Sequence, residues 1–375
     1  MPPRDHAFLS ASSSHRWLNC PPSARLCEHY EDKVSNFAIE GTNAHTLCEY
    51  YLKLALGIET ENPIENMSYY NEEMDECARL YVTYIIDIVN ELKSCGKDVS
   101  VLIERRLDYS RFVAEGFGTG DCLIIADDEM HVIDYKHGKG VFVEADHNTQ
   151  MQLYALGALE MFDTEGTIKT VHMTIFQPRR GNIATFTLEK DELYFWAEEI
   201  LKPTADLAWR GEGEYSCGEW CQFCKAKADC RKRAETNLEI AKYEFRSPPL
   251  LTDEEIADIL TKVDPLVSWA NDIKAHAYQS AMEGKTWKGY KLVAARSTRK
   301  YADEKAVAEA VINAGYDPYE RRLLTITDMQ KMLGKDKFSE VLGGLIIKPE
   351  GKPTLVPDSD SRPAITNAKY EFTEI

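Results

Sequence analysis

Hydrophobic positions recur at helical spacing in three early segments of the chain. These segments are residues 42–54, 72–93 and 148–162. In the first segment Thr42 or Asn43 is the expected N-cap, because each side chain can accept a hydrogen bond from a free backbone N–H group. That start would place His45 in the first turn, above Gly41, which would allow a close approach to the backbone.

From residue 101 onward the pattern changes to short runs of aliphatic and β-branched residues, which are typical of strands. The runs are residues 101–104, 117–125, 131–136, 171–177 and 182–188. The first three predict a meander, in which the polar turn 127–129 brings Asp121 and Asp134 together on antiparallel strands. The last two predict a pair of strands around a short turn, followed by a helix.

The composition changes near residue 243, which marks a domain boundary. For a chain of 375 residues we expect a large domain over residues 1–242 and an accessory region over residues 243–375. At the start of the accessory region, Thr252 and Glu255 form a capping box that opens a helix. Pro265 is expected to interrupt or kink this helix.

The chain is acidic, with a net charge of −18, and 44% of its residues are hydrophobic. No apolar run approaches the ~20 residues that a transmembrane helix needs, and the short polar N-terminus lacks a signal-peptide core. We therefore expect a cytoplasmic protein, in the host cytoplasm if a phage encodes it, with no membrane partner. The charge argues against a surface coated with nucleic-acid contacts, but it leaves room for a local basic groove.

One stretch departs from the acidic composition, because residues 284–301 contain no acid and interleave basic with aromatic residues. Such a mixture suits DNA, since basic side chains bind phosphates and aromatic rings stack on bases. The candidate DNA-binding residues are Lys288, Lys291, Arg296 and Arg299. The alternative is a solvated hairpin edge guarded by lysines.

Four of the ten cysteines fall close together, in the pattern Cys217-x3-Cys221-x2-Cys224-x5-Cys230. A reducing cytoplasm disfavours a disulfide framework, so metal ligation is the leading interpretation. Zinc would accept four neighbouring thiolates, whereas an iron–sulfur cluster can take its thiolates from distant segments. The spacing alone does not decide between them.

Asp134, Tyr135 and Lys136 end the third predicted strand. Alternate side chains of a strand share a face, so Asp134 and Lys136 point the same way and Tyr135 points to the other side. A carboxylate beside an ammonium group can hold a divalent metal and its water. For an isolated motif of this kind, the alternative is an ion pair at a solvated strand end. Gln150 and Tyr154 lie four residues apart on one helix face, where both can hydrogen-bond a phosphate or a metal-bound water.

Taken together, these motifs have the order and rough spacing found in a known family. Gly41-x3-His45, Gly118-x-Gly-Asp121, Asp134-Tyr135-Lys136 and Gln150-x3-Tyr154 resemble motifs of the PD-(D/E)XK nucleases of the RecB and AddB type. Trp17-Leu18-Asn19-Cys20-Pro21 and Cys221-x2-Cys224-x5-Cys230 resemble cysteine segments of the CRISPR-adaptation nucleases and AddB-like proteins. The resemblance spans residues 10–235, and the C-terminal part resembles phage and prophage nuclease-like proteins.

The resemblance implies an α/β fold with a restriction-endonuclease-like core, in which helices flank a central mixed sheet. An N-terminal helical segment and a small α+β C-terminal region would accompany this core. The resemblance also implies a 4Fe–4S cluster that staples the N-terminus onto the core, with Zn²⁺ as the alternative. The cluster ligands would be Cys20, Cys221, Cys224 and Cys230. Cys217 departs from the four-ligand pattern and is an alternative to Cys20, and Cys27 is a weaker alternative because no proline follows it.

By the same resemblance the core would bind Mg²⁺ or Mn²⁺. Its ligands would be His45, Asp121, Asp134 and the backbone carbonyl of Tyr135. Glu104 is an additional candidate ligand, because related nucleases often carry an acid on the preceding strand. The catalytic set would be Asp121, Asp134, Lys136, Gln150 and Tyr154. In this set Lys136 would orient or activate the water, while Gln150 and Tyr154 would position the water and the DNA backbone.

These expectations predict a metal-dependent deoxyribonuclease, more specifically an exonuclease that acts in phage or prophage DNA recombination or replication. Its partners would be DNA and a phage recombinase or single-strand-binding protein. Two other classes of protein stay open. One is a non-catalytic DNA-binding accessory protein of recombination on a nuclease fold, and the other is a zinc-stabilised phage scaffold.

Overall fold

The structure is a computed structural model that describes residues 7–31, 36–239, 252–293, 301–319 and 323–347. The chain divides into two compact units, residues 1–279 and 280–375. The expected boundary at residue 243 lies upstream of this division. Most of helix α9 (Asp253–Met282) therefore belongs to the first unit.

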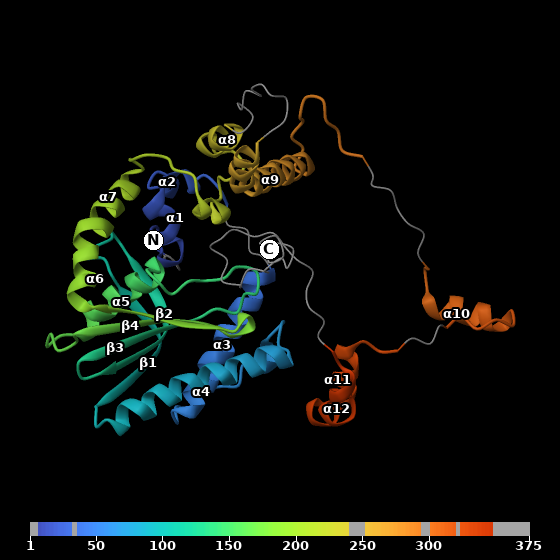
Figure 1. Cartoon of the computed structure of the whole chain (residues 1–375), viewed down its shortest axis with the longest axis horizontal. Coiled ribbons are helices and arrows are strands. Elements are labelled where there is room, and N and C mark those ends of the chain that lie inside the picture. The colour runs from blue at the N-terminus through green and yellow to red at the C-terminus, as the bar shows by residue number, and fades with distance from the viewer. Residues whose placement is uncertain (1–6, 32–35, 240–251, 294–300, 320–322, 348–375) are drawn as a thin grey trace, which may run out of the picture. The chain divides into compact units, whose positions relative to one another are not determined.

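A five-stranded mixed sheet forms the centre of the first unit (Figure 1). In spatial order its strands are β1 (Val99–Asp108), β2 (Phe117–Ala126), β3 (Glu129–Tyr135), β4 (Thr170–Gln177) and β5 (Asn182–Glu189). Neighbours are antiparallel except β3 and β4, which are parallel. A parallel step needs a crossover, which helix α5 (Thr149–Phe162) supplies. The expected α/β fold with a central mixed sheet is confirmed.

Helices cover both faces of the sheet (Figure 1). One face packs on α5 and on the helical segment α6 (Lys190–Trp196), η4 (Ala197–Leu201) and α7 (Lys202–Arg210). The other face packs on α3 (Asn36–Ala55) and α4 (Glu72–Ser94). Leu123 is buried on the first face and the adjacent Ile124 on the second. Burial on both faces explains why β3 and β4, inside the sheet, are almost continuously buried.

Helix α3 begins earlier than the sequence predicted. It starts at Asn36, so Thr42 and Asn43 lie inside the helix and His45 lies in its third turn. The prediction failed because a helix tolerates an interior glycine at about 1 kcal/mol, so Gly41 does not end it. A Cβ atom at Gly41 would meet no atom within 4 Å, and the expected close backbone approach is therefore wrong.

The N-terminal segment, residues 7–30, packs against α5 and α7. It contains η1 (Ala11–Ser13), α1 (Ser14–Asn19) and α2 (Ser23–Cys27). Trp17 is fully buried in the core that α5 also lines. Arg25 donates a 2.6 Å hydrogen bond from Nε to the Trp209 carbonyl at the end of α7, and its guanidinium lies 4.2 Å from the ring centre of Phe8.

Downstream of α7 lie η5 (Glu219–Phe223) and α8 (Arg231–Leu238), and α9 packs beside them. The buried Arg233 donates a 2.5 Å hydrogen bond to Asp272 Oδ2 on α9, and Lys227 Nζ lies 3.0 Å from Asp272 Oδ1. The capping box of α9 is confirmed, because Thr252 and Glu255 each accept a hydrogen bond from the other's backbone N–H. Pro265 lies inside α9 and does not interrupt it, whereas the alternative expectation of a kink stays a prediction.

The regular elements described in the second unit are helices. After α9 they are α10 (Glu304–Asn313), α11 (Ile326–Leu333), α12 (Lys335–Leu342) and the short η7 (Gly343–Leu345). The strands of the expected α+β region do not appear among its described residues. Throughout the described part of the chain, no helix combines the length and apolarity that crossing a bilayer requires.

Candidate functional site

Three side chains able to ligate metal converge where α3 meets the sheet. His45 of α3, Glu104 of β1 and Asp121 of β2 place their ligand atoms within 4.8 Å of one another. His45 Nδ1 is 3.3 Å from Asp121 Oδ1. The other Asp121 oxygen accepts a 2.7 Å hydrogen bond from the backbone N–H of Tyr135, which fixes the carboxylate against β3. The structure thus brings three predicted ligands together.

Tyr135 ends β3 beside this group, and its backbone carbonyl is a further predicted ligand. Its ring is fully buried and packs edge-on against the His45 ring, with a centroid separation of 5.6 Å. The ring of Tyr135 therefore supports the imidazole. Strand alternation predicted that Tyr135 points away from the face that Asp134 occupies, and Tyr135 is buried on the α3 face whereas Asp134 bonds to α5.

Glu104 reaches the group through an unusual backbone conformation. Its φ is 46°, in the left-handed region that residues with a side chain rarely adopt. The residues on either side of it pair with β2, whereas Glu104 interrupts the ladder opposite Asp121. Strain of this kind costs about 1–3 kcal/mol and clusters at functional sites. Glu104, an additional candidate in the sequence, is thus a full member of the group.

Asp134 lies in a neighbouring network with Lys136, Gln150 and Tyr154. Asp134 Oδ2 is 2.8 Å from Lys136 Nζ, in an ion pair that is not aligned as a hydrogen bond. Gln150 connects both residues, because its Nε2 donates to Asp134 Oδ1 at 3.1 Å and its Oε1 accepts from Lys136 Nζ at 3.1 Å. Gln150 Nε2 also donates to the Tyr154 hydroxyl at 3.2 Å. The predicted polar residues of β3 and α5 therefore form one network.

The missing side chain of Gly118 leaves the space on the sheet that the Tyr154 ring occupies. A Cβ atom at Gly118 would lie 2.7 Å from Tyr154 Cε1, closer than real Cβ contacts. Any residue with a side chain would have to displace the ring. The glycine of the Gly118-x-Gly-Asp121 motif therefore has a packing role, and it acts on the network through Tyr154.

The metal-binding group and the Asp134 network together hold more acidic side chains than basic ones. Burial, followed by repulsion from Asp121, raises the pKa of Glu104 to about 8. Burial also raises the pKa of Asp134, although Lys136 opposes the shift. Burial disfavours the charged form of His45, but Asp121 outweighs it and raises the pKa of His45 to about 9. Three carboxyl groups thus face two bases, which is an arrangement that a divalent cation would relieve.

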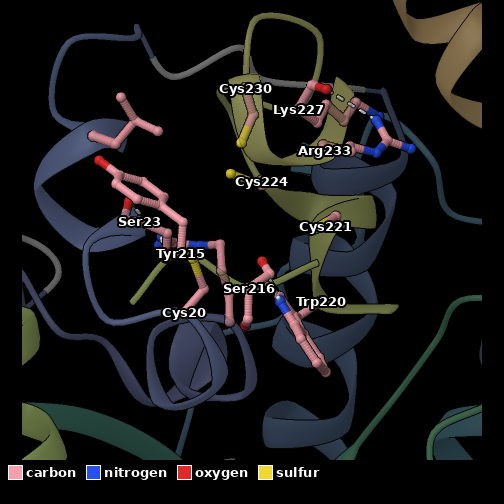
Figure 2. Close-up of a pocket in the computed structure, with 12 residues that line it drawn as sticks. Cys20, Ser23, Tyr215, Ser216, Trp220, Cys221, Cys224, Lys227, Cys230 and Arg233 are labelled. Carbon is pink, nitrogen blue, oxygen red and sulfur yellow. Dashed lines mark hydrogen bonds between the residues drawn. The ribbon is translucent and has the colours of Figure 1, made fainter. Parts of the chain in front are cut away.

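Four cysteines line a separate cavity (Figure 2). Cys20 follows α1, Cys221 and Cys224 lie in and after η5, and Cys230 is the N-cap of α8. These are the four cysteines that the sequence predicted to converge. Three basic residues line the same cavity, namely Arg16, Lys227 and Arg233. They would offset the negative charge of a thiolate-bound metal centre.

The two alternative cysteines lie beside the predicted ligands. Cys217 Sγ is 3.9 Å from Cys221 Sγ, and Cys27 Sγ is 3.7 Å from Cys224 Sγ. The hydrogen-bonded contact with Cys217 lowers the pKa of Cys221 to about 6. A hydrogen bond from Cys224 likewise lowers the pKa of Cys27 to about 5. Because Cys27 Sγ lies this close to a predicted ligand, Cys27 is a stronger candidate than the sequence indicated.

The predicted DNA-binding stretch is described in part. Lys288 and Lys291 are exposed in irregular structure that follows α9, and no hairpin forms among the described residues there. Lys285 Nζ lies 4.1 Å from the ring centre of Trp287. Arg296 and Arg299 lie outside the described residues. The pairing of a lysine with an aromatic ring is thus observed at one position of this stretch.

Comparison with known protein families identifies the family of this chain. Residues 6–363 match the family described as "Protein of unknown function (DUF2800)". The chain belongs to the DUF2800 family. This DUF2800 protein is also similar to the crystal structure of SSO0001, at 17% sequence identity over 50% of this chain and 95% of that chain, with a TM-score of 0.22. At this TM-score the likeness says nothing about activity, and the resemblance to nucleases stays a prediction.

One further residue next to the site was not predicted. Arg179, in the turn between β4 and β5, donates 2.9 Å hydrogen bonds to Glu40 of α3 and to Glu73 of α4. It also donates to the His137 carbonyl at 3.3 Å, just beyond β3. Arg179 thus connects α3 and α4 to the segment that follows β3, next to the site. The sequence shows a basic turn here but not its acidic partners.

Proposed function

We propose that this DUF2800 protein is a metal-dependent deoxyribonuclease that hydrolyses phosphodiester bonds. One observation carries the proposal: a His–Glu–Asp group able to bind a divalent cation lies beside a lysine held by a carboxylate and an amide. Hydrolysis of a phosphodiester requires both an activated water and positive charge near the phosphate. By resemblance to RecB-type nucleases, the enzyme is an exonuclease of phage or prophage recombination or replication.

The chemistry of the donors fits a hard cation. Carboxylate oxygens suit Mg²⁺ and Mn²⁺, and the imidazole of His45 is a better ligand for Mn²⁺ than for Mg²⁺. Asp134 Oδ2 is buried without an aligned hydrogen-bond partner, which leaves it a free lone pair. When bound, the ion would lower the pKa of a water and offset charge on the phosphate.

The residues of the chain would hold the reacting groups in place. Asp121 has one oxygen committed to the Tyr135 N–H, so its other oxygen stays directed at the cation position. Lys136 is fixed by two partners and can donate its remaining protons to a water or a phosphate oxygen. Gln150 sets the direction of Lys136, and Tyr154 in turn holds Gln150.

We propose further that the cysteine cavity holds a 4Fe–4S cluster, with Zn²⁺ as the alternative. Cys20 comes from the N-terminal segment and the other three cysteines come from residues 221–230, so a metal centre would join segments far apart in the chain. Thiolate ligands give such a centre a net negative charge. The support for this proposal is the convergence of four cysteines in a cavity that Arg16 and Arg233 also line.

Nuclease activity is tested with anaerobically purified protein, end-labelled linear DNA, circular DNA, and Mg²⁺ or Mn²⁺. Degradation of linear but not circular DNA is expected for an exonuclease. Lys136→Met and Asp134→Asn are expected to lower the rate by at least about 100-fold, as removal of a positioned proton-transfer group does. Lys139→Met is the matched control, since this exposed lysine pairs with Glu73 outside the network.

Equal rates in Lys136→Met and Lys139→Met would overturn the proposed site. Metal-dependent DNA binding without cleavage by the parent would instead favour the non-catalytic accessory protein. The cysteine proposal has its own readout, which is iron, sulfide and zinc content. Cys230→Ser is expected to lose the metal, whereas Cys95→Ser, at an exposed cysteine, is expected to keep it. Equal metal content in both variants would contradict the predicted ligand set.

A further inference from the structure

A second group of side chains able to ligate metal lies at the other end of β3. Glu129 begins β3, His131 follows on the same face, and His172 lies on the parallel neighbour β4. The register pairs His131 with His172, and their rings stack with centroids 4.5 Å apart. One ligand atom from each of the three residues lies within 4.8 Å of the other two. This group takes no part in the site described above.

Both imidazoles present a ring nitrogen to Glu129. His172 Nε2 is 3.3 Å from Glu129 Oε2, and its other ring nitrogen is 2.9 Å from the Thr187 hydroxyl on β5. A hydrogen bond to the distal nitrogen is the usual way that proteins orient a metal-binding histidine. His131 Nε2 is 4.0 Å from Glu129 Oε1, and it is buried with no hydrogen-bond partner among the described residues.

An ion pair explains part of this arrangement but not all of it. Lys97 Nζ lies 3.0 Å from Glu129 Oε1 and 2.9 Å from Asp128 Oδ1, so Glu129 has a cationic partner. That pair uses one Glu129 oxygen and leaves Oε2 facing His172. It also leaves His131 Nε2 buried and unsatisfied, which is unfavourable for a polar atom.

We propose that Glu129, His131 and His172 bind a divalent transition metal of the zinc class. Bonds of about 2.0–2.1 Å in a tetrahedral site separate ligand atoms by about 3.3 Å. The distance from His172 Nε2 to Glu129 Oε2 already has this value. His131 Nε2 is 4.0 Å from the other Glu129 oxygen, and the three ligand atoms lie within 4.8 Å of one another, so His131 must move closer to share an ion with Oε2. Two imidazoles and one carboxylate select zinc-like ions over Mg²⁺. A water would complete the coordination, because the three side chains are 15–23% exposed.

The metal would be separate from the proposed catalytic ion. Glu129 and Asp134 are five residues apart on one strand, which corresponds to about 16 Å. The ligands of this metal come from the parallel strands β3 and β4, and the hydrogen bond between His172 and Thr187 extends the link to β5. Bound zinc would therefore cross-link the far end of the sheet.

The test measures zinc binding by the full-length protein, purified, treated with a chelator and titrated with Zn²⁺ in a calorimeter. The parent is expected to bind zinc at a site that His131→Gln and His172→Gln weaken by more than about tenfold, the loss that even an outer partner of a metal site causes. His147→Gln is the matched control, because that histidine is 71% exposed and far from the group in sequence. All variants keep the cysteines, so zinc bound there cancels in the comparison.

A second pair of variants separates metal binding from the ion pair. Glu129→Gln removes a ligand and the ion pair, whereas Lys97→Met removes the ion pair alone. Lys97→Met is expected to bind zinc at least as tightly as the parent, and zinc is expected to raise the thermal midpoint of Lys97→Met more than that of Glu129→Gln. Equal zinc affinity in the parent, His172→Gln and Glu129→Gln overturns the proposal. If His131→Gln does not fold, the other two variants decide the question. None of these readouts depends on nuclease activity.

Discussion

Replacing Gly118 by alanine is the most direct test of how the sheet supports the α5 network. The new Cβ atom would lie 2.7 Å from Tyr154 Cε1, whereas ordinary contact begins at 3.4 Å, so the ring must retreat by about 0.7 Å. Tyr154 is 7% exposed and has buried neighbours on α5, so it cannot retreat freely. Its hydroxyl is 3.2 Å from Gln150 Nε2, and the same retreat would stretch that hydrogen bond beyond its 3.5 Å limit.

We expect Gly118→Ala to lower the free energy of unfolding by about 1–3 kcal/mol, the usual effect of overpacking by one methyl group. Urea unfolding followed by circular dichroism measures the change. Gly138→Ala is the matched control, because a Cβ atom there meets nothing within 4 Å. It corrects for the entropy that any glycine-to-alanine change removes from the unfolded chain.

A double variant decides whether Tyr154 is the cause. In the Tyr154→Leu background the clashing ring atom is absent, so Gly118→Ala should cost at least about 1 kcal/mol less than it does in the parent. Two results would refute the reasoning. One is equal stability of Gly118→Ala and Gly138→Ala, and the other is an unchanged effect of Gly118→Ala when Tyr154 is leucine.

Three further predictions concern other parts of the chain. Gly41→Ala should raise the free energy of unfolding by about 0.5–1 kcal/mol in a denaturant titration, since it lies inside α3 with open space around it. Burial disfavours the charged Asp272, but hydrogen bonds from Arg233 and Lys227 lower its pKa. The ionised Asp272 therefore stabilises the fold fully above about pH 4, which is the pKa of an aspartate in the unfolded chain. This stabilisation is lost as the pH falls through the lower pKa that Asp272 has in the folded protein. Thermal midpoints should show the parent more stable than Asp272→Asn at pH 7, with a gap that narrows below pH 4. The double variant Lys288→Ala with Lys291→Ala should weaken DNA binding. The slope of log K against log salt concentration should become shallower by about 0.9 for each phosphate that the protein no longer neutralises. Fluorescence anisotropy from low to moderate salt measures this slope, and an unchanged slope would contradict the assignment.

Local periodicity predicted the parts of the site that lie on single elements. Alternation along β3 placed Asp134 and Lys136 on one face, and the four-residue spacing placed Tyr154 beside Gln150; the hydrogen bonds agree with both. The start of α3 was missed because Gly41 reads as a helix boundary, although the helix runs through it and Arg179 binds Glu40 just upstream. The helix cost of one glycine is small enough for the helix to continue.

Groups built from several segments were harder to predict. The His131–His172 contact depends on the parallel register of β3 and β4, which a 34-residue crossover hides in the sequence. Glu104 joins the metal-binding group through a left-handed backbone conformation that no residue pattern announces. The closeness of Cys27 to Cys224 arises from the way the N-terminal segment packs, so the spacing of the cysteines along the chain could not show it.

The packing of the N-terminal segment has a consequence for synthesis on the ribosome. Trp17 needs α5 to be buried, Arg25 needs the end of α7, and Cys20 meets Cys230 only after 210 more residues have been added. At about 5–20 residues per second, that interval is about 10–40 s. Until these partners are made, the N-terminal segment exposes the Trp17 ring and the Cys20 thiol. This segment therefore closes onto the core late, and nascent chains that stall before α7 would present it to chaperones and oxidants.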